Sequence, residues 1–204
     1  MFTPIYKVYI QKRLLLGGAG LSKEQEEKLT TATNQKLAEV GGRDIISCWS
    51  TWSSETIQWF GISEYPNIKA VMSHTRFLEE LGWLNMADTM TLLGTADAPI
   101  QDFAALLKTE QPIVKLWMVK TLRPEFYQAT EEERQKAMSQ QDGIYEGYGK
   151  TVLTCSSRWA SEQYSGFGFD IFPDLEACQK VHQELEKIDW FRWTETDSVL
   201  GVPA

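Results

Sequence analysis

The sequence is short of basic residues, with 20 lysines and arginines against 28 aspartates and glutamates, and its formal net charge is -8. Proteins that bind nucleic acids usually carry a basic excess, because contacts to phosphates supply most of their affinity, so we expect no nucleic-acid partner. Long apolar runs are also missing. None approaches the roughly 18 residues that a membrane-spanning helix needs, so we expect no membrane partner.

Cysteine is scarce as well: the sequence has three, and no two of them form a C-x-x-C pair. Three cysteines cannot close a disulfide framework, which indicates a reducing, cytoplasmic location. Basic residues also stand where a secretion signal would need its apolar stretch. With only two histidines, His74 and His182, far apart in the sequence, we expect no metal site.

An internal repeat organises the chain. Residues 4–14 recur as residues 112–122, and residues 44–95 align without a gap on residues 151–202. The aligned stretches share rare residues at the same positions: Cys48 and Cys155, Trp52 and Trp159, Gly61 and Gly168, Trp83 and Trp190. We therefore predict two copies of one small domain, 1–95 and 112–204, joined by a helical connecting segment at 96–111.

Each copy predicts the element order β-α-β-β-α-β. In the first copy, residues 5–11 alternate like a strand, and Ser22 starts a helix with a capping box. Strands at 44–51 and 55–62 are joined by a tight turn, a helix begins at Pro66, and a last strand covers 88–93. This order is the ferredoxin-like α+β unit, a four-stranded antiparallel sheet with both helices on one face. The segment Gly17–Gly20 lacks the spacing of a phosphate-binding loop and predicts an ordinary loop.

Strand alternation assigns the two faces of each sheet. Even-numbered positions from Tyr6 to Ile10 are apolar, so we place them under the helices, together with the apolar set around Cys48. Odd-numbered positions from Ile5 to Gln11 mix charge and aromatic rings, so we place them against the other sheet. Each sheet leaves one face open, and two such faces can cover each other.

This pattern of elements and its duplication resemble the dimeric α+β barrel superfamily, as a fused member with both halves in one chain. The resemblance implies two tandem repeats packed sheet to sheet as an intrachain barrel. It also implies a range of activities: cofactor-independent monooxygenases of antibiotic biosynthesis, haem-degrading monooxygenases, chlorite-dismutase-like haem proteins, lactone isomerases and polyketide cyclases. Because one fold serves many chemistries, the function has to come from the site.

Two equivalent lysines, Lys7 and Lys115, would lie between the predicted sheets, with Glu55 and Glu162 as partners. One interpretation is a pair of structural ion pairs. The other is a pocket for a planar organic molecule, in which Lys7 and Glu55 transfer protons. Its predicted walls are Lys115, Tyr9, Trp49, Trp59, Trp117, Arg158 and Tyr164.

His74 is the third predicted catalytic residue. It lies close to the apolar stripe of the second helix, and in haem-binding members of the superfamily a helix histidine ligates the iron. Three hypotheses stay open. The first is an enzyme without a cofactor, of the monooxygenase or cyclase type, acting on a small organic molecule. The second is a non-catalytic binding or assembly protein. The third is a haem protein that uses His74. A homodimer of the fused unit is also open, because an exposed sheet edge can pair with another chain.

Overall fold

The computed structural model describes residues 4–14 and 21–204. The predicted loop Gly17–Gly20 lies outside these residues. The chain divides into two compact units, which we call unit 1 (up to Ala96) and unit 2 (Asp97–Pro203). Both have a mixed α+β fold.

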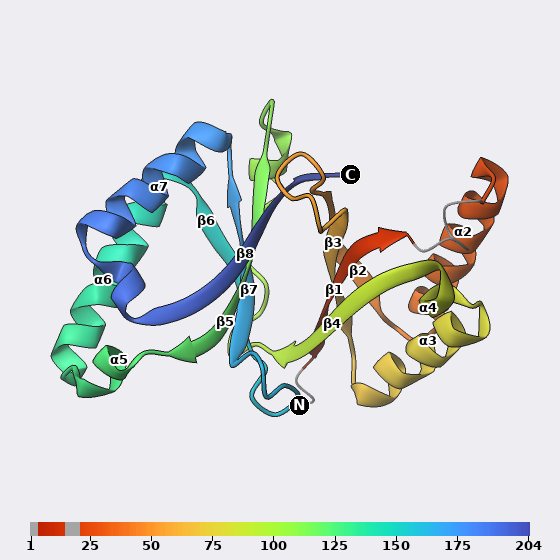
Figure 1. The fold of residues 1–204 in the computed structure, drawn as a ribbon, viewed down its shortest axis with the longest axis horizontal. Coiled ribbons are helices and arrows are strands. Elements are labelled where there is room, and N and C mark those ends of the chain that lie inside the picture. Colours follow the sequence, from red (N-terminus) through yellow and green to blue (C-terminus); the bar gives the residue numbers. More distant parts are fainter. Residues whose placement is uncertain (1–3, 15–20) are drawn as a thin grey trace. The chain divides into compact units, whose positions relative to one another are not determined.

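Unit 1 is a four-stranded antiparallel sheet with its helices on one side (Figure 1). Its elements are β1 (Ile5–Leu14), α2 (Lys23–Glu39), β2 (Arg43–Trp49), β3 (Trp59–Tyr65), α3 (Ile68–Glu80), α4 (Trp83–Met86) and β4 (Ala87–Thr95). The strand order is β2-β3-β1-β4. The order of elements is the predicted one, with α4 as a single added turn.

Unit 2 repeats this arrangement, with the strand order β6-β7-β5-β8. Its elements are η1 (Leu106–Lys108), β5 (Ile113–Leu122), α5 (Pro124–Gln128), α6 (Glu131–Tyr148), β6 (Lys150–Ser156), β7 (Gly166–Phe172), α7 (Leu175–Lys187), η2 (Trp190–Arg192) and β8 (Thr194–Pro203). The helix predicted in 96–111 is only the short 3₁₀ turn η1, so that prediction was wrong for most of the segment.

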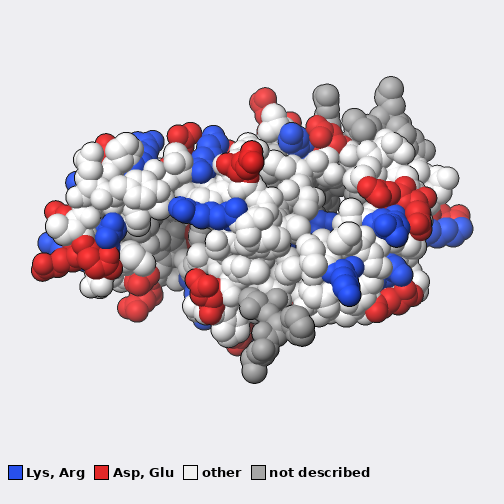
Figure 2. Space-filling view, turned by 90° about the horizontal axis from the view of Figure 1, so that it is seen from below, with Lys and Arg blue, Asp and Glu red and all other residues white. Residues whose placement is uncertain are grey.

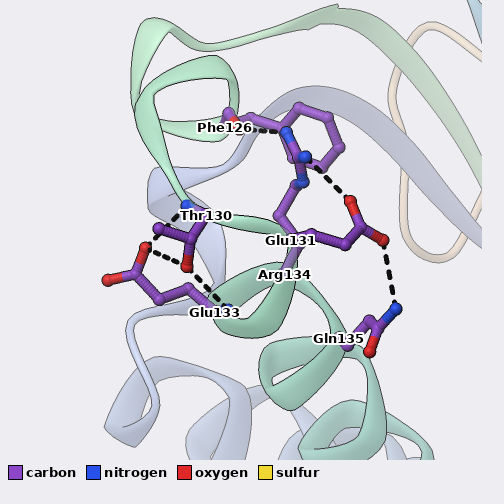
Figure 3. Close-up of polar contacts among 6 residues, drawn as sticks. All are labelled: Phe126, Thr130, Glu131, Glu133, Arg134 and Gln135. Carbon is purple, nitrogen blue, oxygen red and sulfur yellow. Dashed lines mark hydrogen bonds and ion pairs between the residues drawn. The ribbon is translucent and has the colours of Figure 1, made fainter.

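Polar side chains cap the helices. Ser22 starts α2 and Thr130 starts α6, each in a capping box. In the second box, Thr130 Oγ1 accepts from the Glu133 N–H at 3.2 Å, and Glu133 Oε2 accepts from the Thr130 N–H at 2.7 Å (Figure 3). These bonds satisfy backbone donors that have no partner inside the helix. The helix start predicted at Pro66 is two residues early, since Asn67 caps α3 and the helix begins at Ile68.

The predicted tight hairpin between β2 and β3 is wrong, because nine residues, 50–58, connect these strands. The N–H groups of Ser53 and Ser54 both donate to the Ser50 carbonyl, at 2.9 and 3.0 Å. The Ser54 hydroxyl in turn accepts from the N–H groups of Thr56 and Ile57. Serine side chains that bond nearby backbone compete with the strand ladder, so the strands separate early.

The face assignment from alternation is inverted in unit 1. Ile5 packs in one apolar cluster with Leu37 of α2 and Val71 of α3. Lys7 Nζ donates to Thr75 Oγ1 of α3 at 3.2 Å. The odd-numbered positions of β1 therefore face the helices. Alternation separates two faces but cannot say which is covered by helices when both carry apolar residues.

The even-numbered positions of β1 lie on the helix-free face of the sheet. Val8 pairs with Ile62, which pairs with Ile46, and Cys48 pairs with Phe60 across β2 and β3. All five side chains are buried. The same inversion holds in unit 2, where Ile113 packs under α6 and α7. The residues that the repeat preserves best, such as Cys48, thus lie away from the helices.

Charges of both signs are interspersed over the face shown in Figure 2, and the described residues there form no continuous basic area. None of the described helices is both long enough and apolar enough to cross a membrane.

Candidate functional site around His74

The structure corrects the predicted roles of the loop residues. Glu55 is exposed in the connection between β2 and β3, not on β3, and the hydrogen bond of Lys7 goes to Thr75 instead. Glu162 and Arg158 are likewise exposed in the connection between β6 and β7. The proposed proton transfer between Lys7 and Glu55 therefore has no geometric support.

The aromatic residues predicted to form the walls of the pocket lie in different environments within each unit. In unit 1, Tyr9 lies against Gly61, whereas Trp49 is 42% exposed. Trp59, half-buried, is the strand partner of Trp49. In unit 2, Tyr164 donates its hydroxyl hydrogen to Asp197 at 2.9 Å.

Lys115 and Trp117 belong to a buried polar cluster under the helices of unit 2. Its centre is Asp170, a carboxylate of β7 with only 1% exposure. Trp117 Nε1 donates to it at 3.1 Å, and the hydroxyls of Thr151 and Tyr145 donate at 2.9 Å each. Burial raises the pKa of Asp170, and the Lys115 ammonium opposes that rise. The three donors and the ammonium offset the cost of burying this carboxyl group.

His74 is the predicted site residue that the structure places in the most specific surroundings. It lies on α3 with 5% exposure, facing β3. Its Nδ1 is 2.7 Å from the Tyr65 hydroxyl, and its Nε2 is buried with no hydrogen bond. A buried imidazole nitrogen without a partner is unusual, because an unmet polar group costs about 1–3 kcal/mol.

Burial, helped by nearby charges, keeps the imidazole of His74 neutral. Burial and the positive charges of Lys7 and Lys36 outweigh an opposing interaction with the Thr33 backbone, and together these effects lower the pKa of His74 to about 4. Burial also lowers the pKa of Lys7. A neutral imidazole has a free lone pair on one nitrogen, as metal ligation requires.

A short polar chain fixes the ring from the sheet side. The Ser63 hydroxyl donates to Asp44 Oδ1 at 2.5 Å, and both side chains lie near Tyr65. Burial raises the pKa of the Tyr65 phenol, with a further rise from the Asp44 carboxylate, so the phenol stays protonated. Tyr65 was absent from the predicted site. The pairing of β1 with β3 is what reveals Tyr65. Tyr65 lies opposite Ile5, so its side chain is on the same face of the sheet as Lys7.

Helix α2 covers this site with little apolar contact. Only Leu37 of its 17 residues is buried. The buried hydroxyl of Thr33, also on α2, has no hydrogen-bond partner. Most of the stability of a helix in a protein comes from packing of its apolar face, and α2 contributes a single buried side chain to that packing.

The low pKa of His74 predicts a pH dependence of stability. The unfolded chain binds a proton at a histidine near pH 6.5, whereas folded His74 binds one only near pH 4. The contribution of His74 to stability is therefore complete above pH 6.5 and is lost as the pH falls towards 4. Urea unfolding from pH 7 to pH 4 should show a shallower decline for His74→Gln than for the unchanged protein.

His182→Gln is the comparison variant: because burial lowers the pKa of His182 too, this substitution should also make the decline of the unfolding free energy shallower. If the unfolding free energy of His74→Gln falls with pH as steeply as that of the unchanged protein, the assignment of His74 as a buried neutral ring is wrong.

Unit 2 also has an open groove of about 940 Å³ that the sequence did not indicate. It lies between the last turns of α6, the first turns of α7 and the segment 101–106. None of the predicted site residues lines it. The described residues contain no group of three or more His, Cys, Asp or Glu side chains that could hold a metal ion.

No family model matches the sequence, and neither does any curated protein. Solved structures do match. A chlorite dismutase from Candidatus Nitrospira defluvii in complex with imidazole aligns over 98% of this chain and 91% of its own, with 12% identity and a TM-score of 0.76. An arginine-to-alanine mutant of that enzyme aligns over the same shares of the two chains, with 11% identity and a TM-score of 0.77.

A second protein assigned to the chlorite dismutases, TA0507, covers 99% of this chain and 95% of its own, with 15% identity and a TM-score of 0.70. At such identities the likeness concerns the fold. The chain is therefore similar in fold to these chlorite dismutases.

Proposed function

We propose that this chain binds haem, with His74 as the residue that would hold the iron. The observation that carries the proposal is the buried His74 Nε2 atom without a hydrogen bond. Chlorite-dismutase-like proteins are the haem proteins to which the sequence already showed a resemblance, and the fold comparison favours them over the monooxygenases and cyclases.

The side chains around His74 in unit 1 suit a haem group. A histidine that ligates a metal usually forms a hydrogen bond through its second nitrogen to a partner that fixes the orientation of the ring. The Tyr65 hydroxyl is that partner for Nδ1 of His74. Lys7 and Lys36 place positive charge close to the ring, which favours the carboxylates of haem. When bound, haem would supply the redox chemistry of its iron, and Tyr65 and Lys7 would orient the ligand and keep it unprotonated.

His182 fits less well. It is half-buried, and its ring lies 5.3 Å from the ring of Phe191. The buried nitrogens without partners in the described residues include His74 Nε2 but none from His182. Room for haem at His74 would come from displacement of α2, which buries only Leu37.

Haem titration of the purified protein tests the proposal. We expect a Soret band with saturable binding for the unchanged protein and for the control His182→Ala. His74→Ala should lose the band. Tyr65→Phe should keep it but weaken binding by about 10-fold, since it removes only the group that orients the ring. Circular dichroism checks that each variant is folded. The same band and affinity in folded His74→Ala would overturn the proposal.

Other expectations from the sequence stay predictions. They are the origin of the two units as copies of one repeat, with boundaries at 1–95, 96–111 and 112–204, and their sheet-to-sheet packing in an intrachain barrel. A cytoplasmic location and a homodimer of the fused unit also stay predictions.

A further inference from the structure

Lys115 carries a nearly buried charge in unit 2 that has no acceptor. Its side chain is 8% exposed and lies on β5, directly opposite Asp170 of β7. The oxygens of Asp170 are taken by three other donors. Among the described residues, no hydrogen bond or ion pair involves the Lys115 ammonium. An ammonium has three N–H groups to donate, so its burial without an acceptor is costly.

The equivalent lysine of unit 1 has the acceptor that Lys115 lacks. In the aligned stretches of the sequence, Lys7 matches Lys115 and Thr75 matches His182. Lys7 Nζ donates to Thr75 Oγ1 at 3.2 Å. In unit 2, a histidine of α7 stands in place of that threonine, and Lys115 lies close enough for its charge to lower the pKa of His182. The position thus brings an imidazole N–H beside the ammonium instead of an acceptor for it.

Both of these groups can be reached from the surface of unit 2. Lys115 Nζ is not one of the fully enclosed polar atoms without a partner in the described residues, so it still touches solvent. His182 is half-buried, and no hydrogen bond involves its ring within the described part of the chain. Its ring lies 5.3 Å from the ring of Phe191, which is 36% exposed. The pair of donors therefore stands beside an exposed apolar ring.

The charges around the two donors favour a ligand with a single negative charge. Lys115 supplies one positive charge, whereas burial lowers the pKa of His182 and keeps its ring neutral. Two carboxylates are close by, because Asp170 acts on Lys115 and Glu186 acts on His182. The Cys178 thiol also faces Lys115, and burial raises its pKa, so it adds no charge. A doubly charged anion would leave one charge unmatched beside these carboxylates.

We propose that unit 2 binds a small apolar monocarboxylate between Lys115 and His182. One oxygen of the ligand accepts from the Lys115 ammonium, and the other accepts from a ring N–H of His182. The hydrocarbon part of the ligand lies against the ring of Phe191, where binding removes apolar surface from water. The site shares no residue with the one around His74, which belongs to unit 1, so either proposal can fail without the other.

Titration with sodium butyrate, followed through the ring signals of the two histidines by NMR, tests the proposal. We expect a saturable shift of the His182 signal, with the His74 signal unchanged as the internal reference. The pKa of His182 should rise at saturation, because a bound carboxylate stabilises the imidazolium. Sodium chloride at the same ionic strength should give no saturable shift, and inorganic phosphate should bind at least about 10-fold more weakly than butyrate.

Three substitutions separate this site from general electrostatic attraction, with the affinity measured by saturation transfer to the butyrate protons. Lys115→Met should weaken binding at least about 10-fold, which corresponds to about 1.4 kcal/mol. His182→Thr copies unit 1 and gives the ammonium an acceptor within the protein, so it should weaken binding to a similar extent. The matched control is Lys180→Met, which removes the same charge from the exposed side of α7 and should leave the affinity within about twofold.

Circular dichroism checks that each variant is folded, and His182→Thr decides the outcome if Lys115→Met is not. Unchanged affinity in folded His182→Thr would overturn the proposal, and so would an equal loss in Lys180→Met. A His182 shift of the same size with chloride, or no saturable binding of butyrate at millimolar concentration, would overturn it as well.

Discussion

Asp170→Ala is expected to lower the free energy of unfolding by about 3–5 kcal/mol, among the largest single effects in this chain. The substitution removes the common acceptor of Trp117, Thr151 and Tyr145. It also takes away the negative charge beside the Lys115 ammonium, which is only 8% exposed. The three buried donors are then left without an acceptor, and the buried ammonium is left without an opposite charge. Urea unfolding at neutral pH measures the loss.

A double-mutant cycle identifies the cause. Lys115→Met replaces the ammonium by an apolar group of similar length, so Asp170→Ala combined with Lys115→Met should cost less than the two separate losses added together. Asp170→Asn, which keeps an acceptor oxygen, should cost less than Asp170→Ala. Strict additivity of Asp170→Ala and Lys115→Met would show that the two groups are not coupled.

The order of the elements could be predicted because each boundary has a local cause. Ser22 and Thr130 cap their helices through bonds to residues three positions ahead, and such bonds depend only on nearby sequence. The assignment of sheet faces has no local cause, because it depends on which side the helices cover. That explains why Lys7 was placed on the wrong side while its strand was correct.

The polar clusters show why residue identity alone missed part of the site. In unit 1, Ser63 of β3 donates to Asp44 of β2. At the equivalent positions of unit 2, the roles are exchanged: Thr151 of β6 donates to Asp170 of β7. The hydrogen bond recurs, but neither residue matches its counterpart in the repeat. Such a pair is visible only once strand register places the two side chains together.

His74 could be selected from the sequence because histidine is rare in this chain and the apolar stripe of a helix is easily recognised. Its lack of a partner at Nε2 could not, since that depends on the atoms that α2 brings over it. Glu55 was selected on the assumption that a tight hairpin places it on a strand. It lies instead in the serine-rich connection, where it is exposed.

Gly168→Ala is expected to lower the free energy of unfolding by about 3 kcal/mol, although it adds a single methyl group. The new carbon would overlap the Leu153 carbonyl oxygen and the indole ring of Trp117. Strand backbone cannot move away without breaking its ladder, so the indole has to shift, and its bond to Asp170 weakens. The measurement is again urea unfolding of the purified variant.

Gly143→Ala provides the control with the same chemical change. A side chain at Gly143 meets nothing within 4 Å, and alanine is the better helix former, so this variant should gain up to about 1 kcal/mol. Opposite signs for the two substitutions would show that the close approach of Trp117, and not a general property of glycine, sets the requirement at position 168. A neutral Gly168→Ala would mean that the indole has free space to move, and the expected cost of Asp170→Ala would then fall as well, since its Trp117 bond would be dispensable.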